Sequence, residues 1–188
     1  MIRVLETPRL VLRPLELSDA GAVQDLFPRW EIVRFLADHV PWPYPADGAL
    51  SYIRDAALPA MERGTEWHWS IRPRAGPDRL VGVIGLMDKP DDNRGLWLDP
   101  AWQGRGLMTE ASAAVMHFWF ETLGRSVLRV QKAEANLGSR RLSERDGMRL
   151  VGIHDRDFVS GRFPAGIWEI TREEWRGRRS PAGDAPGR

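Results

Sequence analysis

The apolar side chains of this chain recur with two different periods. Alternation of apolar and polar positions predicts strands, because successive side chains of a strand point to opposite faces of a sheet. Apolar residues three and four positions apart predict helices with one buried face. Strands are expected over residues 9–15, 66–73, 79–88, 95–100, 127–133, 149–155 and 164–175. Helices are expected over residues 18–28, 47–64, 103–124 and 139–145.

The order of these elements predicts the fold class. Two pairs of neighbouring strands are joined by turns with no helix between them, which predicts antiparallel hairpins. A Rossmann repeat would instead place a helical crossover after each strand. The sequence therefore predicts an α+β (mixed α/β) protein. Within it, the three prolines of residues 40–47 predict a loop, and Pro59 is expected to kink the second helix.

Length and composition predict the extent of the domain and the cellular compartment of the protein. The 188 residues suit one domain, which we place at residues 1–175. Residues 176–188 hold no large apolar side chain, so we expect a disordered tail rich in Arg, Gly and Pro. No apolar run reaches the ~20 residues of a membrane span, and the N-terminus lacks the apolar segment of a signal peptide. We therefore expect a soluble, cytoplasmic protein without membrane contact.

Charge and residue usage argue against several functions. The formal net charge is +1, whereas nucleic-acid-binding domains carry a large basic excess, so the Arg-rich tail alone gives weak support for a nucleic acid as partner. The absence of cysteine excludes disulfides, thiolate metal sites and a cysteine nucleophile. The four histidines are dispersed without ligand spacing, so no metal is expected. On its predicted strand, His68 lies on the face opposite to Trp67 and Trp69, where a pH-sensitive role is an alternative to simple packing.

Residues 96–111 are the segment that carries chemistry. A strand ends near Asp99, then Gly104 and Gly106 follow with one residue between them, and a helix begins at once. Glycine lets a backbone approach a ligand closely, and free N–H groups converge at a helix N-terminus, so this arrangement predicts a phosphate cradle. The lysine of P-loop proteins and the GxGxxG pattern of dinucleotide-binding proteins are both missing. On these residues alone, an ordinary glycine-containing turn is the alternative.

The segment resembles the Q/R-x-x-G-x-G/A loop of the GNAT N-acetyltransferases, whose amides bind the pyrophosphate of acetyl-coenzyme A. Residues 103–108 read QGRGLM, and Met108 replaces the small residue usual at the last position. The flanking WQGRGLMTEA, the opening ETPRLVLRPLELSDA, the WPYP before the second helix and the N-x-x-S…D-G-M of residues 136–148 resemble the branch of ribosomal-protein N-terminal acetyltransferases. The resemblance implies a mostly antiparallel twisted sheet of about seven strands, with splayed central strands and about four helices.

The resemblance also implies how the co-substrate binds. The pantetheine arm of acetyl-coenzyme A would lie between the splayed strands, against the backbone of residues 97–99, and amides from residues 104–109 would hold the pyrophosphate. Asn136 and Ser139 match positions near the thioester, although capping of a loop is the alternative for Asn136. The implied site comprises Trp97, Leu98, Asp99, Gln103, Gly104, Arg105, Gly106, Leu107, Met108, Thr109, Asn136 and Ser139.

The catalytic residues follow less directly from the resemblance. Many family members place a Tyr after the Asn to protonate the leaving thiolate, and Ser143 occupies that position here. The Glu that this branch often carries before its G-Y strand is replaced by Asn93. Glu134 is our candidate general base, with Asp88 and a chain of waters as alternatives. Glu110 is expected to be structural, because a carboxylate in the first turn favours the positive end of the helix dipole.

The resemblance leads to an enzyme that transfers acetyl from acetyl-coenzyme A to a primary amine, either a protein N-terminus or a small molecule. The family often dimerises, so a homodimer is compatible with it. The alternative is a non-catalytic module that binds acetyl-coenzyme A as a sensor, since the usual Tyr and Glu are missing. Among the aromatic residues, Trp97, Trp119 and Trp168 are expected in the core. The elements that form the acceptor side in the family are flanked by Trp30, Trp42 and Tyr44.

Overall fold

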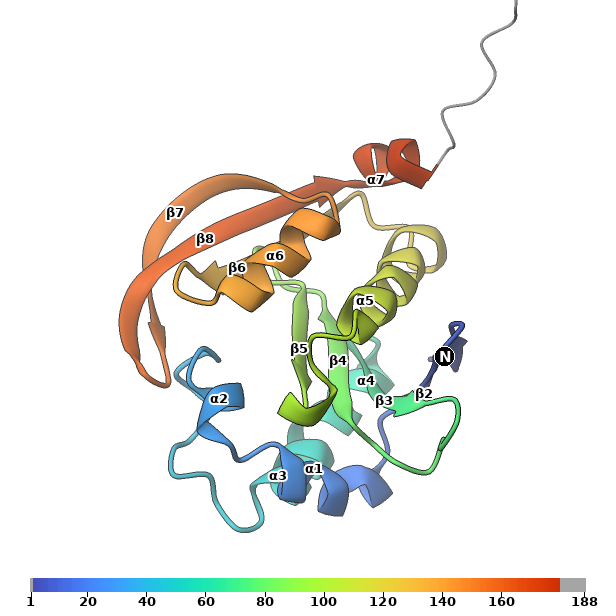
Figure 1. Cartoon of the computed structure of the whole chain (residues 1–188), viewed down its shortest axis with the longest axis vertical. Helices are drawn as coiled ribbons and strands as arrows, with labels where there is room; N and C mark the ends of the chain where they lie inside the picture. Colours follow the sequence, from blue (N-terminus) through green and yellow to red (C-terminus); the bar gives the residue numbers. More distant parts are fainter. Residues whose placement is uncertain (1, 180–188) are drawn as a thin grey trace, which may run out of the picture.

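The computed structural model describes residues 2–179, in which eight strands form two sheets (Figure 1). The first sheet is antiparallel, with its five strands side by side in chain order, and the second has the order β6-β8-β7. The strands are β1 (Leu5–Glu6), β2 (Leu10–Pro14), β3 (Glu66–Pro73), β4 (Gly82–Met87), β5 (Arg94–Leu98), β6 (Val127–Ala133), β7 (Arg149–Phe158) and β8 (Gly161–Thr171). The division between the two sheets falls between β5 and β6, the two strands expected to splay.

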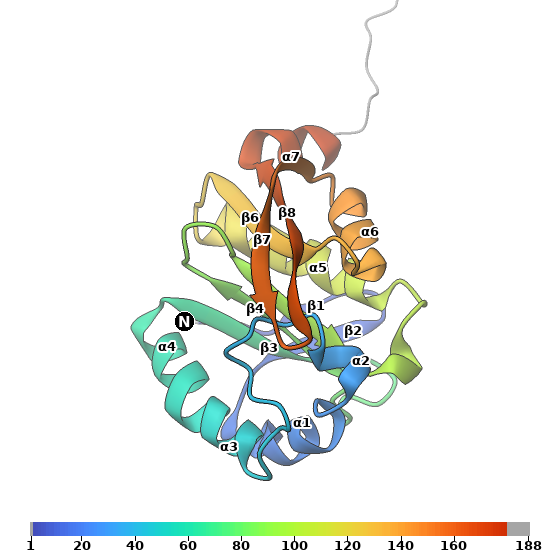
Figure 2. The ribbon, with the colours of Figure 1, turned by 90° about the vertical axis from the view of Figure 1, so that its left-hand side faces the viewer.

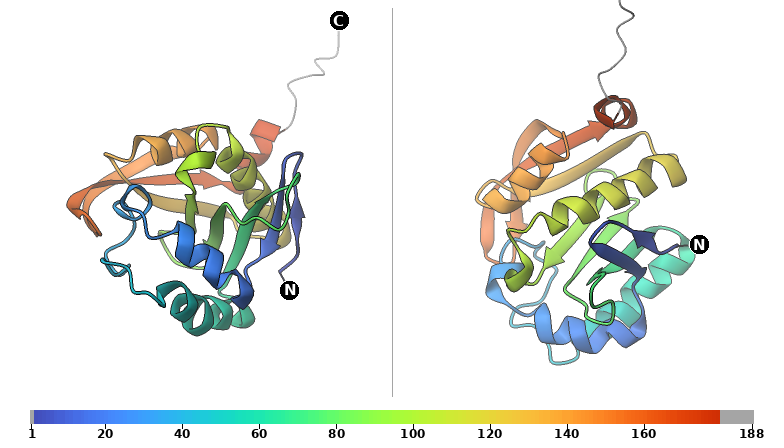
Figure 3. Two further views of the ribbon diagram at one scale, coloured as in Figure 1. Left: turned by 60° about the horizontal axis from the view of Figure 1, so that its bottom comes forward. Right: turned by 45° about the vertical axis from the view of Figure 1, so that its right-hand side comes forward.

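Helices cover both faces of the first sheet (Figure 3). They are η1 (Leu17–Asp19), α1 (Ala20–Leu26), α2 (Trp30–Val33), α3 (Gly48–Tyr52), η2 (Ile53–Ala57), α4 (Leu58–Arg63), η3 (Pro100–Trp102), α5 (Leu107–His117), η4 (Phe118–Thr122), α6 (Leu137–Arg145) and α7 (Arg172–Arg179). Helix α5 packs against β2 and β4 on one face. No helix in residues 2–179 is long and apolar enough to cross a membrane.

Alternation along β3 divides the core between these two faces. Trp67 and Trp69 are buried on the face of α5, where the ring of Trp69 lies 5.1 Å from that of Phe118. His68 is buried on the opposite face, as the alternation predicts, and packs against Gly85 of β4. A side chain at position 85 would overlap the imidazole ring, so this glycine makes room for a buried histidine.

The second predicted helix, over residues 47–64, contains a local distortion rather than a simple kink. Helix α3 passes into the π-helical turn η2, and α4 follows with Pro59 in its first turn. A proline there lacks an N–H to donate, and a π-helical turn is one way for a helix to accommodate a break in its hydrogen bonds. The helix ends at Gly64, whose φ of 69° is the left-handed conformation of a C-terminal cap.

The end of the chain differs from the sequence-based expectation. The last strand was predicted to reach residue 175, but β8 ends at Thr171 and α7 begins at the next residue. A capping box explains the change: Glu174 N–H donates to Thr171 Oγ1 (3.2 Å), and Thr171 N–H donates to Glu174 Oε2 (2.8 Å). Residues 176–179 of the predicted tail lie in α7, and residues 180–188 lie outside the described residues. Strand β1 and helix α2 were not predicted.

Candidate active site

The two sheets are joined at the start of β5 by Asn93, which is buried. Its backbone N–H donates to Arg129 O of β6 (2.7 Å), and its side-chain oxygen accepts from Arg129 N–H (2.8 Å). Its side-chain NH₂ donates to the carbonyls of Met87 (3.2 Å) and Lys89. The amide of Asn93 therefore acts as a structural joint between the two sheets. The branch of ribosomal-protein N-terminal acetyltransferases, which this sequence resembles, often carries a Glu at this position.

Beyond this joint β5 and β6 part, and each leaves an edge without a strand partner in the described chain (Figure 1). The Asp99 N–H donates to Val81 O of the segment before β4 (2.8 Å), so these two residues form a hydrogen-bonded pair. Hydrogen-bonded and non-hydrogen-bonded pairs alternate along two antiparallel strands. By that alternation the backbone groups of Trp97 face β4, and those of Leu96 and Leu98 face the open edge. Leu96, which sequence reasoning did not single out, thus joins Leu98 there.

Two of the residues expected beside the pantetheine arm, Trp97 and Asp99, also make side-chain contacts within the protein. The side chain of Trp97 packs on Phe27 of the segment after α1, with ring centroids 5.5 Å apart. The Asp99 carboxylate is buried, accepts from Ala101 N–H (3.2 Å) and pairs with Arg29 (3.1 Å). These two side chains hold the end of β5 in place, and its backbone edge is what faces the gap.

The loop after β5 presents unpaired amides. Gly104 and Gly106 both have a φ of 75°, and Gly106 is the N-cap residue of α5. The backbone N–H groups of residues 104–109 donate to no acceptor in the part of the chain that the structure describes. Positive φ at both glycines turns this run of amides outward at a helix N-terminus, which is a favourable arrangement for an anion.

Side chains hold this loop in place and add positive charge beside it. Gln103 Nε2 donates back to Leu98 O (2.9 Å), which closes the loop on β5, and Leu107 is buried and anchors the first turn of α5. The guanidinium groups of Arg79 and Arg105 each lie 5.3 Å from the ring of Trp102. The loop therefore has positive side chains beside its free amides, and Thr109 follows in the first turn of the helix.

Glu110 ties the first turn of α5 to the segment before β2. Its carboxylate accepts from Thr7 Oγ1 (2.5 Å) and from Arg9 N–H (2.8 Å), and it forms an ion pair with Arg9 Nε (2.7 Å). Arg9 also donates to Arg105 O of the glycine loop (3.0 Å). Burial opposes ionisation of Glu110, but the hydrogen bonds from Thr7 and Arg9 outweigh it and lower its pKa. Its contacts are structural.

Helix α6 carries three of the predicted site residues. Asn136 caps the helix, because its side-chain oxygen accepts from Ser139 N–H (3.2 Å). This is the capping role weighed above for Asn136. Ser143 is fully buried, and its hydroxyl has no hydrogen-bond partner in residues 2–179. An unpartnered buried hydroxyl is uncommon and indicates a place where a ligand or water completes the site.

Two further buried polar atoms without a partner in the described chain lie beside β8. One is Oε1 of Glu134, whose other carboxylate oxygen forms an ion pair with Arg140 of α6 (3.4 Å). The other is Nε1 of Trp168, whose side chain is buried. Both atoms lie near Gly166, since a Cβ there would be 2.8 Å from the first and 3.0 Å from the second. The predicted base Glu134 thus lies in a polar region between β6, β8 and α6.

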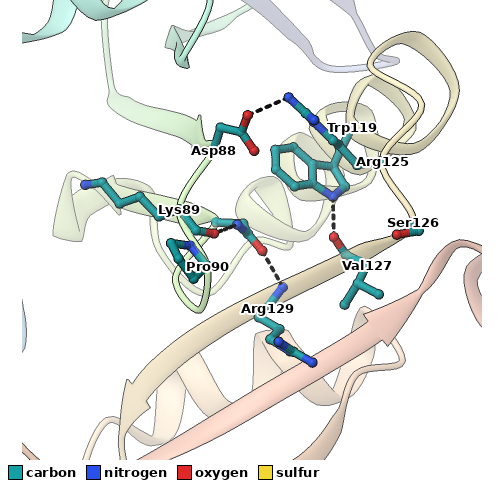
Figure 4. A pocket seen from close by; sticks show the side chains of 9 residues that line it. Asp88, Lys89, Pro90, Trp119, Arg125, Ser126, Val127 and Arg129 are labelled. Atoms are coloured by element: carbon teal, nitrogen blue, oxygen red, sulfur yellow. Dashed lines mark hydrogen bonds and ion pairs between the residues drawn. The ribbon is translucent and has the colours of Figure 1, made fainter.

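A pocket of about 200 Å³ lies at the other end of β5 (Figure 4). It is lined by the loop after β4 and by the start of β6, with Asn93 and Trp119 in its wall. Asp88 lies at its rim in an ion pair with Arg125 (2.6 Å). The pocket adjoins the joint at the start of β5, whereas the glycine loop follows the end of that strand.

The aromatic residues predicted on the acceptor side divide into two groups. Trp30 and Trp42 are exposed, and their rings lie 5.5 Å apart. Tyr44 is half-buried with its ring 5.0 Å from that of Phe27, and burial raises the pKa of its hydroxyl. Phe27 also contacts Trp97, so these rings connect the proline-rich loop to β5. Of the three expected core residues, Trp119 and Trp168 are buried, whereas Trp97 is half-buried and packs against the core on the side of α1.

The β7–β8 hairpin reaches across to the segment after α2 (Figure 2). Val159 N–H donates to Leu36 O (3.0 Å), and Ser160 N–H donates to Arg34 O (3.1 Å). An isolated bridge pairs Ala37 with Phe158. Backbone hydrogen bonds therefore connect the second sheet to the first half of the chain at the Asn93 joint and at this hairpin tip.

His68 belongs to a separate, closed group of side chains. Its Nε2 lies 2.7 Å from Glu66 Oε2, and its ring meets that of Tyr52 edge-on. Burial opposes the ionisation of Glu66, but the contact with His68 outweighs it and lowers the pKa of Glu66. The histidine is thus held on three sides, by Gly85, Glu66 and Tyr52.

Parted sheets with a glycine loop of free amides at a helix N-terminus define the GNAT class of acyltransferase folds. The family model described as an acetyltransferase (GNAT) domain matches residues 9–149, which is 141 of the 188 residues. The chain therefore belongs to the GNAT acetyltransferase family, and it is an N-acetyltransferase of this type.

Relatives and solved structures agree with this assignment. The chain is 28% identical over 178 residues to the "Probable N-acetyltransferase YjcK" of Bacillus subtilis (strain 168), covering 88% of this chain and 92% of that protein. RimL, a ribosomal L7/L12 alpha-N-protein acetyltransferase solved in complex with coenzyme A, superposes with a TM-score of 0.77 at 16% identity, covering 90% of this chain and 98% of that one. Spermidine N-acetyltransferase from Vibrio cholerae, solved with coenzyme A and spermine, gives a TM-score of 0.75 at 18% identity, covering 90% and 99%. These two likenesses show the fold.

Proposed function

We propose that this protein transfers the acetyl group of acetyl-coenzyme A to a primary amine by direct attack in a ternary complex. The observation that carries the proposal is the run of unpartnered N–H groups at residues 104–109, beside the open edge of β5. Solved neighbours of the same fold are described as complexes with coenzyme A. Membership of the family supports the reaction class.

The residues present fit coenzyme A. Its pyrophosphate is a dianion that suits the loop amides and the side chain of Arg105, and its amide-bearing arm suits the backbone edge at Leu96 and Leu98. Met108, the departure from the family pattern, packs against the core on the side of α5. Its side chain therefore does not occupy the anion cradle, and the substitution is compatible with binding.

Acetyl-coenzyme A would supply an acetyl group activated as a thioester, and the chain would supply hydrogen bonds. An edge N–H of β5 would donate to the carbonyl oxygen as negative charge develops on it. The hydroxyl of Ser143 has no partner in the described protein, so it is free to donate to the sulfur. A serine is a poor acid, so this hydrogen bond stabilises a thiolate without protonating it.

Deprotonation of the amine has two routes in this proposal. One oxygen of Glu134 has no partner among residues 2–179, which suits a general base, although Arg140 pairs with the other oxygen. The second route needs no base, because an α-amino group with a pKa of about 8 is roughly one-tenth neutral at pH 7. Asp88 is engaged with Arg125, and Asn93 is part of the joint, so neither is our choice.

The acceptor we propose is a protein N-terminus or a small amine. Neighbours of this fold include enzymes described for each, a ribosomal protein and spermidine. Trp30 and Trp42 expose aromatic surface on the segment that faces the β7–β8 hairpin, and we propose that they and Tyr44 contact the acceptor. A homodimer stays a prediction.

A second candidate function is a sensor that binds acetyl-coenzyme A without turnover. It is favoured by one observation: Asn93 is committed to the joint between the sheets, so the Glu used by the resembling branch has no counterpart there. Transfer of acetyl to any member of a panel of amines, measured by release of free coenzyme A, would exclude it.

The cradle is tested by calorimetric titration. Wild-type protein should bind acetyl-coenzyme A and coenzyme A saturably, with ATP as a control that lacks the arm. Gly106→Pro removes one amide from the cradle and should weaken coenzyme A binding about 10- to 100-fold, the loss expected for one hydrogen bond to a charged group.

A matched control is Gly124→Pro, at a glycine with a φ of 68° beyond η4. It imposes similar backbone strain away from the cradle and should leave affinity unchanged. Circular dichroism confirms folding of both variants. Unchanged affinity in a folded Gly106→Pro protein would contradict the placement of the pyrophosphate, and no binding of either coenzyme form to wild type would overturn the proposed function.

A further inference from the structure

Lys132 lies on β6 beyond the joint between the two sheets. Leu128 and Val130 precede it on the same face of the strand and are buried in the core that includes α5. Ala133 points to the other face, where it packs in a cluster with Phe158. Lys132 therefore continues the inner stripe of β6, three residues past Arg129, at the part of the strand whose edge faces the gap.

Four charged groups face Lys132 from the surrounding elements, and they already form two pairs. Asp92, before β5, is paired with Arg156 of β7 (2.9 Å). Asp146, at the end of α6, is paired with Arg94 of β5 (2.7 Å). Asp146 also accepts from the hydroxyl of Ser112 on α5 (2.9 Å). Each neighbouring carboxylate is thus held by an arginine.

Lys132 itself is a partly buried cation without a counter-ion. Its side chain forms no hydrogen bond or ion pair with any residue that the structure describes. Withdrawing a charge from water without a partner is costly, so a position of this kind favours an anion that arrives with a ligand.

The same surroundings lower the pKa of Lys132 toward neutral pH. Burial, reinforced by Arg94 and Arg156 and opposed by Asp92 and Asp146, lowers the pKa of Lys132 to about 8. An ordinary lysine has a pKa of about 10.4 and an ordinary thiol about 8.5. A proton shared between this amine and a thiolate is therefore nearly balanced, which is the condition for efficient transfer.

We propose that Lys132 Nζ is the acid that protonates the sulfur leaving the acetyl group. This inference rests on the proposed function. The carbon–nitrogen bond forms as the carbon–sulfur bond breaks, the electron pair of the latter stays on sulfur, and sulfur takes a proton from Nζ. Lys132 is left neutral and regains a proton from the water that receives the one lost by the acylated nitrogen. The hydroxyl of Ser143 adds a hydrogen bond to the same sulfur.

The first test is binding, with coenzyme A and desulfo-coenzyme A, which lacks the thiol, as probes. At pH 8.5 wild type should bind coenzyme A at least fivefold more tightly, because the thiolate pairs with the ammonium group. Lys132→Met should bind both equally. Lys89→Met is the matched control, since Lys89 is the other lysine of the chain and is half-exposed at the far end of β5. A preference that survives in Lys132→Met would overturn the inference.

The second test is kinetic and separates an acid from a positive charge. We expect the kcat of wild type to decline above pH 8 as Lys132 loses its proton. Lys132→Met should lower kcat about 100-fold with the KM for the amine unchanged, and it should abolish this decline. Lys132→Arg should not recover kcat, because a guanidinium does not release its proton at these pH values. Recovery by arginine, or a change confined to KM, would overturn the role as acid.

These outcomes are distinct from failure of the proposed function. If wild type neither binds coenzyme A nor acetylates any amine, the proposed function fails whatever Lys132 does. If wild type is active and Lys132→Met matches it in kcat and pH profile, the proposed function stands and the role of Lys132 falls. Thermal unfolding confirms that each variant is folded, and removal of an unpaired buried charge is not expected to destabilise the protein.

Discussion

The carboxylate of Glu110 fixes the position of the glycine loop through its contacts with Thr7 and Arg9. It touches Thr7 and Arg9 on one side of α5, and Arg9 in turn holds the carbonyl of Arg105 within the loop. Three contacts to one carboxylate fix where the helix N-terminus, and with it the row of free amides, lies relative to the sheet.

We expect Glu110→Gln to lower the free energy of unfolding at pH 7 by about 1–3 kcal/mol, because a neutral amide replaces a charged acceptor. The lowered pKa of Glu110 sets the pH window. Its contribution is complete above the unfolded-state pKa of about 4.3 and is lost as the pH falls through the lower folded-state value. Denaturant unfolding from pH 7 to pH 3 should show the two proteins converging, and a difference that stayed constant would contradict the assignment.

At the scale of elements, the joint at Asn93 decides how β5 and β6 part. Its amide donates two hydrogen bonds, to the last residue of β4 and to the loop after it, and accepts one from β6, so this position needs both a donor and an acceptor. A carboxylate of the same shape can accept but cannot donate.

Asn93→Asp should therefore destabilise the protein by about 3 kcal/mol or more, since it leaves two buried carbonyls facing a negative charge. Asn136→Asp is the control of equal chemistry, because the Asn136 side chain accepts a bond from Ser139 that an aspartate also accepts. Equilibrium unfolding of both variants measures the difference. Equal stability of the two would show that the joint contributes little.

Helix α7 is the other element whose role is structural and testable. Trp175 is buried, and its ring centroid lies 5.1 Å from that of Phe120 in η4. Trp175→Ala should cost about 3–5 kcal/mol by leaving a cavity in the core. Glu173→Ala, at an exposed position of the same helix, is the control and should stay within about 0.5 kcal/mol of wild type. Thermal or denaturant unfolding distinguishes them.

At the scale of the whole molecule, much of the architecture could be predicted from periodicity. The bounds of β3 and β6 match the expected strands, because alternation is unambiguous where one face is apolar. Helix α7 was missed because Trp175 and the residues before it fit an alternating pattern, and the capping box of Thr171 and Glu174 was not weighed.

The candidate site likewise contains residues that the sequence could predict and residues that it could not. The positions of Gly104 and Gly106 followed from a local motif, since strand, glycines and helix are contiguous in sequence. The joint at Asn93 depends on Arg129, which lies 36 residues away in sequence. The unpaired state of Lys132 depends on two ion pairs between other residues. No local pattern encodes either. Residues that act through long-range packing need the fold before their role can be seen.

The order of strands in the second sheet has a consequence for biosynthesis. The first sheet can assemble as the chain emerges from the ribosome, because each of its strands neighbours the one made just before it. In the second sheet the middle position belongs to β8, which is translated after both β6 and β7, so these two strands have no partner until it appears. A premature stop before residue 161 would therefore remove the centre of that sheet rather than its edge. We expect such truncated chains to be cleared by proteolysis instead of persisting as partly active enzyme.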